Sequence, residues 1–296
     1  GYQSKEITVG GRSVINVVLE DEASTLKEIV VIGYGAVRKE AVTGSVSTLA
    51  GKELSEFATG NVTQALQARL PGVELTQTST KPGASMQIRI RGTRSLTADN
   101  NPLIVLDGVP FAGSIGDINP TDIKSLDILK DASATAIYGA RGANGVILIT
   151  TKKGKGKGSV DYSYSLGVSN ITKKFDLLSA DDYVKAGGTN NGAKTDWQDE
   201  AFRTALTNQH NISYGGGDQS SNYRFSFGVL DQEGIIKNSG IKRYSGSFSG
   251  SKKFINDKLT IGSSLNFAQT LDSGVPVTDN AGFSGDLLGA ILKTNP

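Results

Sequence analysis

Five of the six carboxylates in one polar segment, between Thr172 and Asn208, come nearest to a catalytic or metal-binding set. Such a group can bind Ca²⁺ or supply the acid and base of a hydrolase. The spaced Asp/Asn pattern of a calcium loop is missing, however, and so is a paired-acid motif. Ser179 precedes the first two acids as a helix N-cap does, so we expect helix capping and solubility to account for them. The five are Asp181, Asp182, Asp196, Asp199 and Glu200.

The remaining candidates for chemistry are few. Tyr183 and Trp197 could stack on a sugar ring, but a loop helix packed on neighbouring strands is the interpretation we prefer. His210 is the one histidine, so a Ser-His-Asp triad or a multi-histidine metal site is not expected, and we interpret His210 as structural. Cysteine is absent, which removes disulfides and thiol nucleophiles. The sequence therefore predicts no enzymatic activity, no metal and no cofactor.

Charge and hydropathy exclude two further classes of protein. The chain has 31 Lys+Arg against 29 Asp+Glu, a formal net charge of +2, which gives no electrostatic basis for binding nucleic acid. The longest apolar runs, such as Ile29–Ile32, have four residues, whereas a membrane-spanning helix needs about 20. Glycine provides 37 of the 296 residues. Its usual share is about 7%, so the excess favours β structure with many turns.

Residues 37–151 alternate short strand patterns with short helical ones, which predicts a compact α+β unit. Asp107-Gly108 favours a type I′ hairpin turn, and Gly139 is placed to stop a helix in the left-handed conformation. Helices are predicted at Asn61–Leu70 and Ala132–Tyr138, and strands at Ser45–Leu49, Val73–Gln77, Met86–Arg91, Leu103–Leu106, Asp122–Lys130 and Val146–Thr151.

From Ser159 onward, apolar and polar residues alternate with a period of two. One face is rich in aromatic and aliphatic side chains, and the other carries Ser, Gly, Asn and Thr. This pairing is typical of a barrel wall between lipid and a wet or plugged lumen, whereas a β-sandwich would bury the first face and charge the second. Long segments at 172–208 and 270–296, with shorter ones at 231–240 and 256–257, also favour the barrel. The strands are predicted around Val160–Val168, His210–Tyr214, Tyr223–Val229, Tyr244–Phe248 and Leu259–Phe267.

Three other segments complete the predicted organisation. Residues 1–22 hold two short strands and are expected to be the tail of a β-domain, and residues 23–36 a linker. Residues 152–158 form a Lys/Gly-rich linker, so that the barrel portion runs over 159–296. Gly1 follows no initiator Met or signal peptide, and the last residues resemble a loop, so we expect an N-terminal fragment of a longer protein.

Three motifs in the α+β unit resemble the plug domain of TonB-dependent outer-membrane transporters. They follow in the right order: Ile88–Gly92, Asn101–Pro110, and Leu129–Gly139 continued by Arg141–Thr151. The chain most resembles the SusC/RagA branch, in which a segment similar to Leu26–Gly35 lies between an Ig-like domain and the plug.

This resemblance covers essentially the whole chain. It implies an α+β plug domain at 37–151, followed by the first antiparallel strands of a transmembrane β-barrel. Such a barrel has about 22 strands when complete. Residues 1–22 would then be a short β remnant of a carboxypeptidase-regulatory-like (Ig-like) domain.

The resemblance further implies that one segment contains or adjoins the TonB box, which binds the periplasmic energy-coupling protein TonB. Four β-forming residues between a charge and a glycine suit binding by strand addition. The alternative is an ordinary first strand of the plug or a linker strand. The segment consists of Glu28, Ile29, Val30, Val31, Ile32 and Gly33.

The plug motifs themselves carry further candidate residues. For Arg89 and Arg91, which alternate off one strand, ion pairing with acidic groups of the barrel wall and plain plug solubility stay equally open, and Arg141 could act in the same way. The glycines most simply serve turns and close packing. The remaining motif residues are Gly92, Asp107, Gly108, Tyr138, Gly139 and Gly142.

The function implied by the resemblance is energised uptake of a glycan or peptide nutrient. A SusD-like lipoprotein would help to capture the nutrient at the outer membrane, and the plug and N-terminal segment would be accessible to the periplasm. TonB and outer-membrane lipid are the other expected partners. The competing hypothesis is a soluble α+β and β-sandwich module for binding or scaffolding, in which a second sheet buries the aromatic faces.

Overall fold

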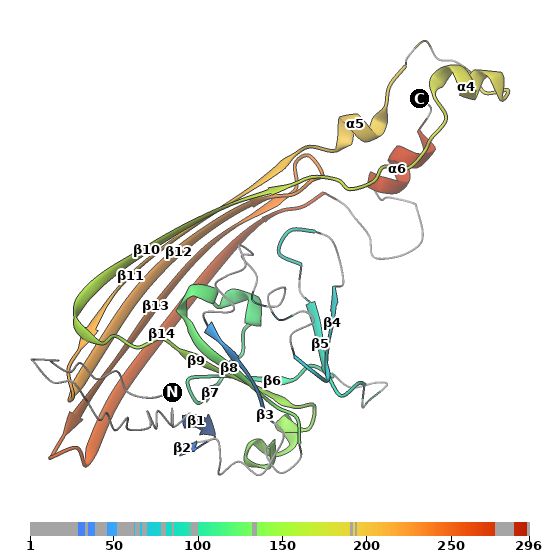
Figure 1. The fold of residues 1–296 in the computed structure, drawn as a ribbon. Helices are drawn as coiled ribbons and strands as arrows, with labels where there is room; N and C mark the ends of the chain where they lie inside the picture. Colours follow the sequence, from blue (N-terminus) through green and yellow to red (C-terminus); the bar gives the residue numbers. More distant parts are fainter. Residues whose placement is uncertain are drawn as a thin grey trace, which may run out of the picture.

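The computed structural model describes residues 29–32, 35–38, 46–51, 62, 66, 70–77, 81–84, 86–93, 95, 100–131, 135–189, 192, 194–275 and 287–294. Two parts are visible in Figure 1: a mixed domain, and a long curved sheet whose inner side the domain contacts. The predicted strands in residues 1–22 lie outside the described residues. Among the described residues, no helix is long and apolar enough to cross a membrane.

The mixed domain is built on a five-stranded sheet with the order β3-β8-β9-β6-β7. The strands β8 and β9 are antiparallel, whereas β6 and β9 are parallel. A separate hairpin joins β4 and β5. The strands are β3 (Val46–Ala50), β4 (Val73–Gln77), β5 (Met86–Ile90), β6 (Leu103–Leu106), β7 (Val109–Pro110), β8 (Ile123–Leu129) and β9 (Val146–Thr151).

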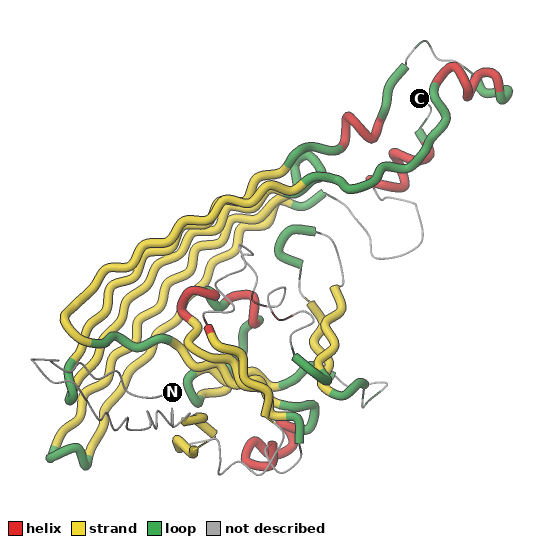
Figure 2. The backbone as a smooth tube through the Cα atoms, viewed as in Figure 1, coloured by secondary structure: helices red, strands yellow, loops and turns green. Residues whose placement is uncertain are grey.

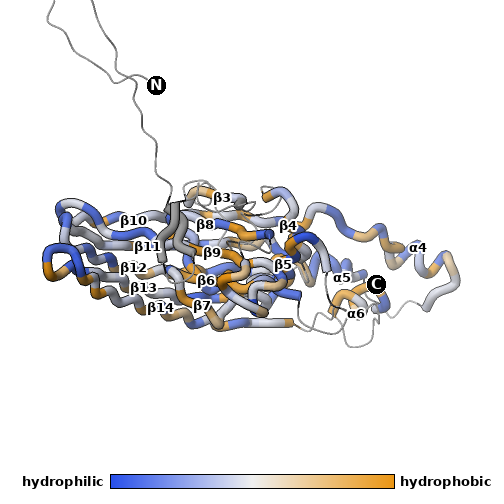
Figure 3. Tube along the Cα trace, turned by 90° about the horizontal axis from the view of Figure 1, so that it is seen from below, coloured by the Kyte–Doolittle hydropathy of each residue, from blue (hydrophilic) through white to orange (hydrophobic). Residues whose placement is uncertain are grey.

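The core of this domain lies between the sheet and the segments that cover it. Apolar side chains of β8 and β9, such as Ile123, Leu126 and Ile147, are completely buried. Figure 3 shows hydrophobic residues concentrated on the central strands β6 and β9. Val62 and Leu66 are helical and buried, while most of the predicted helix at 61–70 lies outside the described residues.

Turn predictions in the domain had mixed outcomes. Asp107 and Gly108 have φ values of 49° and 88°, as the predicted type I′ turn requires. The first helical stretch stops at Gly139, as predicted, with a φ of 59°, although its ψ of −146° is not that of the left-handed helix. A second 3₁₀ turn follows this kink, and the two together are labelled η4 (Ala136–Gly142). Two shorter 3₁₀ turns are η2 (Ile115–Asp117) and η3 (Pro120–Asp122).

The curved sheet, called the wall below, consists of five consecutive antiparallel strands. Figure 2 shows them as one continuous layer. The pattern around His210, which appears weak in the sequence, is a full-length strand of 13 residues. The strands are β10 (Gly156–Ser169), β11 (Ala205–Gly217), β12 (Ser221–Glu233), β13 (Gly240–Phe254) and β14 (Leu259–Ser273).

The two faces of the wall meet different surroundings. Apolar side chains point outward and stay exposed, including Val160 at 65% and Leu265 at 66%. The polar face is turned toward the mixed domain, where Asn211 and Ser213 are buried. The soluble-sandwich hypothesis requires a second sheet over the apolar face. The described residues contain no such sheet. The arrangement is that of a barrel wall facing lipid.

The connections between wall strands correct two expectations. Residues 218–220 and 255–258 form short turns at one end of the wall. Residues 234–239 were expected to be the same kind of turn, but they join β12 to β13 at the opposite end, beside the long loops. The linker prediction at 152–158 was wrong in part, because β10 already begins at Gly156. Gly154 is also buried, and a Cβ there would lie 2.0 Å from the carbonyl oxygen of Tyr223.

The long-loop end carries three short helices, which extend beyond the strands in Figure 1. They are α4 (Ala180–Lys185), α5 (Trp197–Ala201) and α6 (Leu287–Lys293).

Candidate functional site

The mixed domain contacts the wall through a carboxylate at the end of η3. Asn119 caps this 3₁₀ turn, accepting a hydrogen bond from the amide of Thr121, and Pro120 begins it. The turn holds Asp122 against the wall, where its Oδ1 lies 3.1 Å from an Nη atom of Arg224. Its Oδ2 accepts hydrogen bonds from the hydroxyls of Ser226 and Ser247.

This ion pair is sheltered from solvent. The side chains of Arg224 and Asp122 are 12% and 8% exposed. Burial strengthens their attraction but requires that each group be paired. Lys152 lies in the same region, and its amide donates to the carbonyl of Asp122 at 2.8 Å. Burial and the nearby Arg224 guanidinium lower the pKa of the Lys152 ammonium, against the opposing effect of Asp122.

Further polar contacts continue the interface along η2 and η3. The Nδ2 of Asn119 donates to the Oδ1 of Asn211 at 2.6 Å, and Arg243 donates to the carbonyl of Gly116. Any other pairing would leave buried donors or acceptors without a hydrogen-bond partner, which costs free energy. We call this interface the plug–wall seam. Its residues are Gly116, Asn119, Asp122, Asn211, Arg224, Ser226, Arg243 and Ser247.

A cavity of about 60 Å³ lies beside the seam, lined by Phe111, Asn119, Asp122, Asn266 and Phe267 among others. A separate surface ion pair, Lys81 with Asp272 at 2.6 Å, joins the two parts nearer the long-loop end. The hydrogen bonds and ion pairs described between domain and wall mostly involve a charged side chain, with Asn119–Asn211 as a neutral pair.

The TonB-box-like segment forms one strand of a hairpin. Strand β1 (Ile29–Ile32) pairs antiparallel with β2 (Gly35–Arg38), and Val30 lies opposite Val37. Glu28 and Gly33 lie outside the described residues. The two strands form a sheet of their own, so one edge of β1 has no partner strand in the described part of the chain.

The two arginines of the first motif contact the mixed domain itself. Arg91 pairs with Asp131 at 2.6 Å, which joins the first motif to the third. Arg89 donates to the Oδ1 of Asn101 at 2.9 Å. The sequence left open ion pairing with the wall and plain solubility for these residues; the contacts described for both arginines lie within the mixed domain instead.

Other motif residues also organise the domain. Asp107 accepts hydrogen bonds from the amide and hydroxyl of Thr151 at 2.8 and 2.7 Å. Tyr138 packs on the smaller apolar cluster that includes Leu129 and Val146. Gly142 is buried where a Cβ would lie 2.8 Å from the carbonyl of Thr135. Arg141 and Gly92 are exposed, and Gly92 has a φ of 88°.

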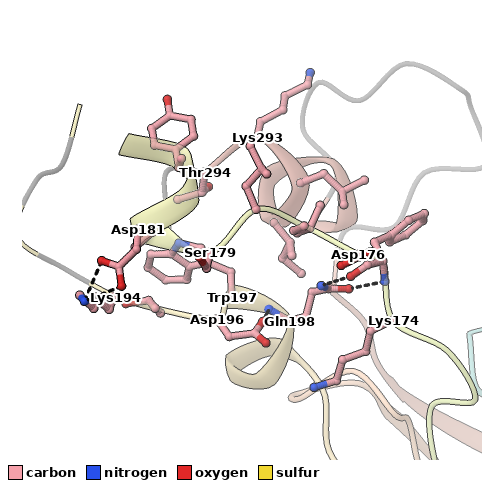
Figure 4. Close-up of a pocket in the computed structure, with 18 residues that line it drawn as sticks. Lys174, Asp176, Ser179, Asp181, Lys194, Asp196, Trp197, Gln198, Lys293 and Thr294 are labelled. Carbon is pink, nitrogen blue, oxygen red and sulfur yellow. Dashed lines mark hydrogen bonds and ion pairs between the residues drawn. The ribbon is translucent and has the colours of Figure 1, made fainter. Parts of the chain in front are cut away.

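A pocket of about 630 Å³ opens among the helices of the long-loop end, as shown in Figure 4. Trp197 and Tyr183 line it together with Phe175. Gln198 closes one side by bonding both backbone groups of Phe175 at 2.8 Å. Such an aromatic-lined pocket has the size and chemistry to bind a small ligand.

The five carboxylates singled out in the sequence of this region are occupied by capping and ion pairs. Asp196 accepts from the first amides of α5, and Asp182 from the hydroxyl of Ser179 at 2.7 Å. The others pair with lysines: Asp181 with Lys194, Asp199 with Lys174, and Glu200 with Lys237. Within the described residues no three acids or histidines gather as metal ligands would.

Sequence reasoning missed the two central residues of the seam. Asp122 was assigned to a strand, and Arg224 was one polar residue on the inner face of another. One pattern could have identified Arg224, because it is the one charged residue on an inner face otherwise made of Ser and Gly between Tyr223 and Val229. Nothing in the sequence indicates that Asp122, 102 residues away, is its partner.

Comparisons with known proteins identify both parts. Residues 38–146 match the family model described as TonB-dependent Receptor Plug Domain. The chain is 42% identical over 278 residues to the TonB-dependent receptor SusC of Bacteroides thetaiotaomicron, covering 88% of this chain and 28% of SusC. It is 39% identical over 306 residues to TonB-dependent receptor P3 of Formosa agariphila, covering all of this chain and 30% of P3. The chain thus spans less than a third of these relatives.

The fold is similar to that of solved receptors. The RagAB peptide transporter superposes with a TM-score of 0.75 at 31% identity, over 86% of this chain and 34% of the other. The siderophore receptor PirA of Acinetobacter baumannii shares the fold alone, with a TM-score of 0.57 at 19% identity over 83% of this chain and 34% of PirA. A plug domain on the polar face of a barrel wall, together with these matches, identifies the chain as part of a TonB-dependent receptor of the SusC/RagA type.

Proposed function

We propose that the receptor containing this chain imports a glycan or peptide nutrient across the outer membrane, energised by TonB and assisted by a SusD-like lipoprotein. The observation that carries the proposal is a folded plug that is held in a barrel wall by a polar seam and preceded by a strand with an open edge. A polar seam can separate and re-form without exposing apolar surface to water.

The proposed coupling site is β1, within the segment from Glu28 to Gly33. Within the described residues one edge of β1 has no partner strand, so its backbone groups can pair with an added strand, which is how extended peptides bind to sheet edges. Force applied there would pass along the chain through β2 to β3. Because β3 is the edge strand of the plug sheet and pairs with β8 alone, it is the first plug strand that pulling would detach.

The proposed outer face is the end that carries α4, α5 and α6. Long loops mark the extracellular end of outer-membrane barrels, and short turns mark the periplasmic end. The pocket lined by Trp197 and Tyr183 would then face the nutrient or the lipoprotein. The relative RagAB is named a peptide importer, which supports a peptide, whereas stacking aromatics suit a glycan equally well.

The proposed coupling is tested with a periplasmic TonB domain and the full-length receptor. Val31→Pro should abolish binding, because the register turns the Val31 amide toward the open edge and proline removes this donor from strand addition. The matched control is Ala36→Pro, in the residue opposite on β2, which removes an amide from the far edge of the hairpin and leaves the β1 backbone intact. Binding that survives Val31→Pro, or that both variants lose equally, would place the coupling site elsewhere.

The lipoprotein partner is tested by purification. A tagged receptor should retain a SusD-like lipoprotein encoded by the same organism through detergent extraction. Recovery of the receptor alone, with the plug still folded, would contradict this part of the proposal and leave the TonB result unaffected.

A further inference from the structure

The short-turn end of the wall is lined with lysines. Six of them are exposed, three before and within the start of β10 and three around the turn between β13 and β14. We call this set the basic collar. It consists of Lys153, Lys155, Lys157, Lys252, Lys253 and Lys258.

Strand register brings the two halves of the collar to the same end. Lys155 and Lys157 flank Gly156, which pairs with Gly217 at the end of β11. The turn that follows β11 contains Ser220, and its carbonyl accepts a hydrogen bond from the amide of Lys253 at 2.7 Å. Positive charge therefore lies at both sides of this end of the wall, at the start of β10 and at the turn between β13 and β14, with the short turn 218–220 between them.

Few acids neutralise the collar. Asp257 lies 3.6 Å from Lys253, and Asp218 is occupied by the amides and hydroxyls of Ser220 and Ser221. The side chains of Lys153, Lys155, Lys157 and Lys258 form no hydrogen bond or ion pair within the described part of the chain. The opposite end differs, since its lysines pair with carboxylates, as Lys174, Lys185, Lys194 and Lys237 do.

Apolar and aromatic groups accompany the charges. The Lys252 ammonium lies 5.5 Å from the centre of the Phe254 ring, and both residues share the outward face of β13 with Phe248. Ile255 in the turn is 69% exposed. Lysines above such outward apolar groups are suited to a boundary where acyl chains end and headgroups begin.

We propose that the basic collar binds the headgroups of anionic phospholipids in the leaflet that surrounds the short-turn end. The aromatic and aliphatic residues below it contact the acyl chains, and the lysines contact the phosphates. The net charge of the whole chain is only +2. The excess of lysines at this end therefore comes from how the fold places them, because the composition is nearly balanced. The inference requires only that the wall lies in the membrane, so it stands apart from the proposed import.

The test uses the full-length receptor in detergent, supplied with equal amounts of phosphatidylglycerol and phosphatidylethanolamine with the same acyl chains. Native mass spectrometry counts the lipids retained. Wild-type receptor should retain phosphatidylglycerol preferentially, and less so at high salt. Each basic residue near an anionic surface strengthens binding about fivefold, so Lys155→Gln, Lys157→Gln and Lys252→Gln together should reduce the preference by up to roughly a hundredfold.

The control removes the same number of charges from the opposite end: Lys173→Gln, Lys185→Gln and Lys237→Gln, all exposed. This variant should keep the preference for phosphatidylglycerol. Equal retention of both lipids by the wild type would overturn the proposal, as would a collar variant that keeps the preference. Equal losses in both triple variants would attribute the effect to net charge and would also overturn it.

Discussion

Asp122 and Arg224 form the buried ion pair that holds the plug to the wall, and the proposed import requires this pair to separate. A buried ion pair contributes less net stability than apolar packing of the same size, because both charges lose their hydration. When the pair separates in a wet lumen, water restores that hydration to both partners. An apolar seam would gain no such compensation, so a polar seam suits an interface that must open. The pairing of Asp122 with Arg224 is also specific, because burying either charge without its partner destabilises the folded state.

Replacing Asp122 by alanine should loosen the plug without unfolding the wall. The change leaves the sheltered Arg224 guanidinium unpaired, and breaking such a pair costs about 3 kcal/mol. In planar bilayers, the Asp122→Ala receptor should begin to conduct ions at lower urea concentration than wild type, with Asp122→Asn between them. Asp182→Ala, which removes an exposed carboxylate at α4, is the control. Identical urea profiles for Asp122→Ala and Asp182→Ala would show that the seam does not hold the plug.

At the scale of single elements, short turns determine how the wall strands align. The turn between β11 and β12 is closed by one carboxylate: Asp218 accepts from the amides of Ser220 and Ser221 at 2.7 Å and also from their hydroxyls. These hydrogen bonds lower the pKa of the Asp218 carboxyl to about 2. The turn thus fixes the register in which Gly217 lies opposite Asn222.

The depressed pKa predicts how this turn responds to acid. A carboxyl whose pKa is lower in the folded state stabilises that state fully above its ordinary value of 3.8, and the effect is lost as pH falls toward about 2. Near neutral pH the Asp218 carboxylate is ionised and the turn stays closed. The backbone amides of residues 217–222 should therefore exchange slowly with deuterium. Asp218→Asn should accelerate exchange at neutral pH already. Unchanged exchange in this variant would show that the carboxylate does not close the turn.

At the scale of the whole molecule, the wall separates two solvents. Its outward residues are exposed here and apolar, while its inward residues are polar and bury their groups against the plug. The same alternation would suit a sandwich only if another sheet covered the apolar face. Lipid is the surrounding that satisfies both faces at once, because the plug supplies hydrogen-bond partners only on the inner side.

Two neighbouring residues of β14 test this division. Leu265 points outward near the middle of the strand, and Ser264 beside it points inward. Leu265→Arg should destabilise the receptor in bilayers by about 2–4 kcal/mol, since it places a charge at the membrane midplane. Ser264→Arg should cost much less, because its side chain lies in a wet lumen. Urea titration in liposomes measures both, and equal costs would contradict the assignment of faces.

The sequence by itself determined the class of fold and much of its detail. Period-two alternation indicated the wall strands, because each side of a strand must match one surrounding. The turn at Asp107-Gly108 was predictable because few residues adopt a positive φ. The strands Val73–Gln77, Leu103–Leu106 and Val146–Thr151 agree with their predicted bounds. All of these are local properties, carried by residues next to one another in the chain.

Only the tertiary structure decided which distant groups meet. The partner of Arg91 is Asp131 and not the wall, and the seam joins Asp122 to Arg224 across 102 residues. The two halves of the basic collar likewise come to the same end of the wall only through strand register. Such pairings follow from the packing of the whole chain, and short-range patterns carry no information about them.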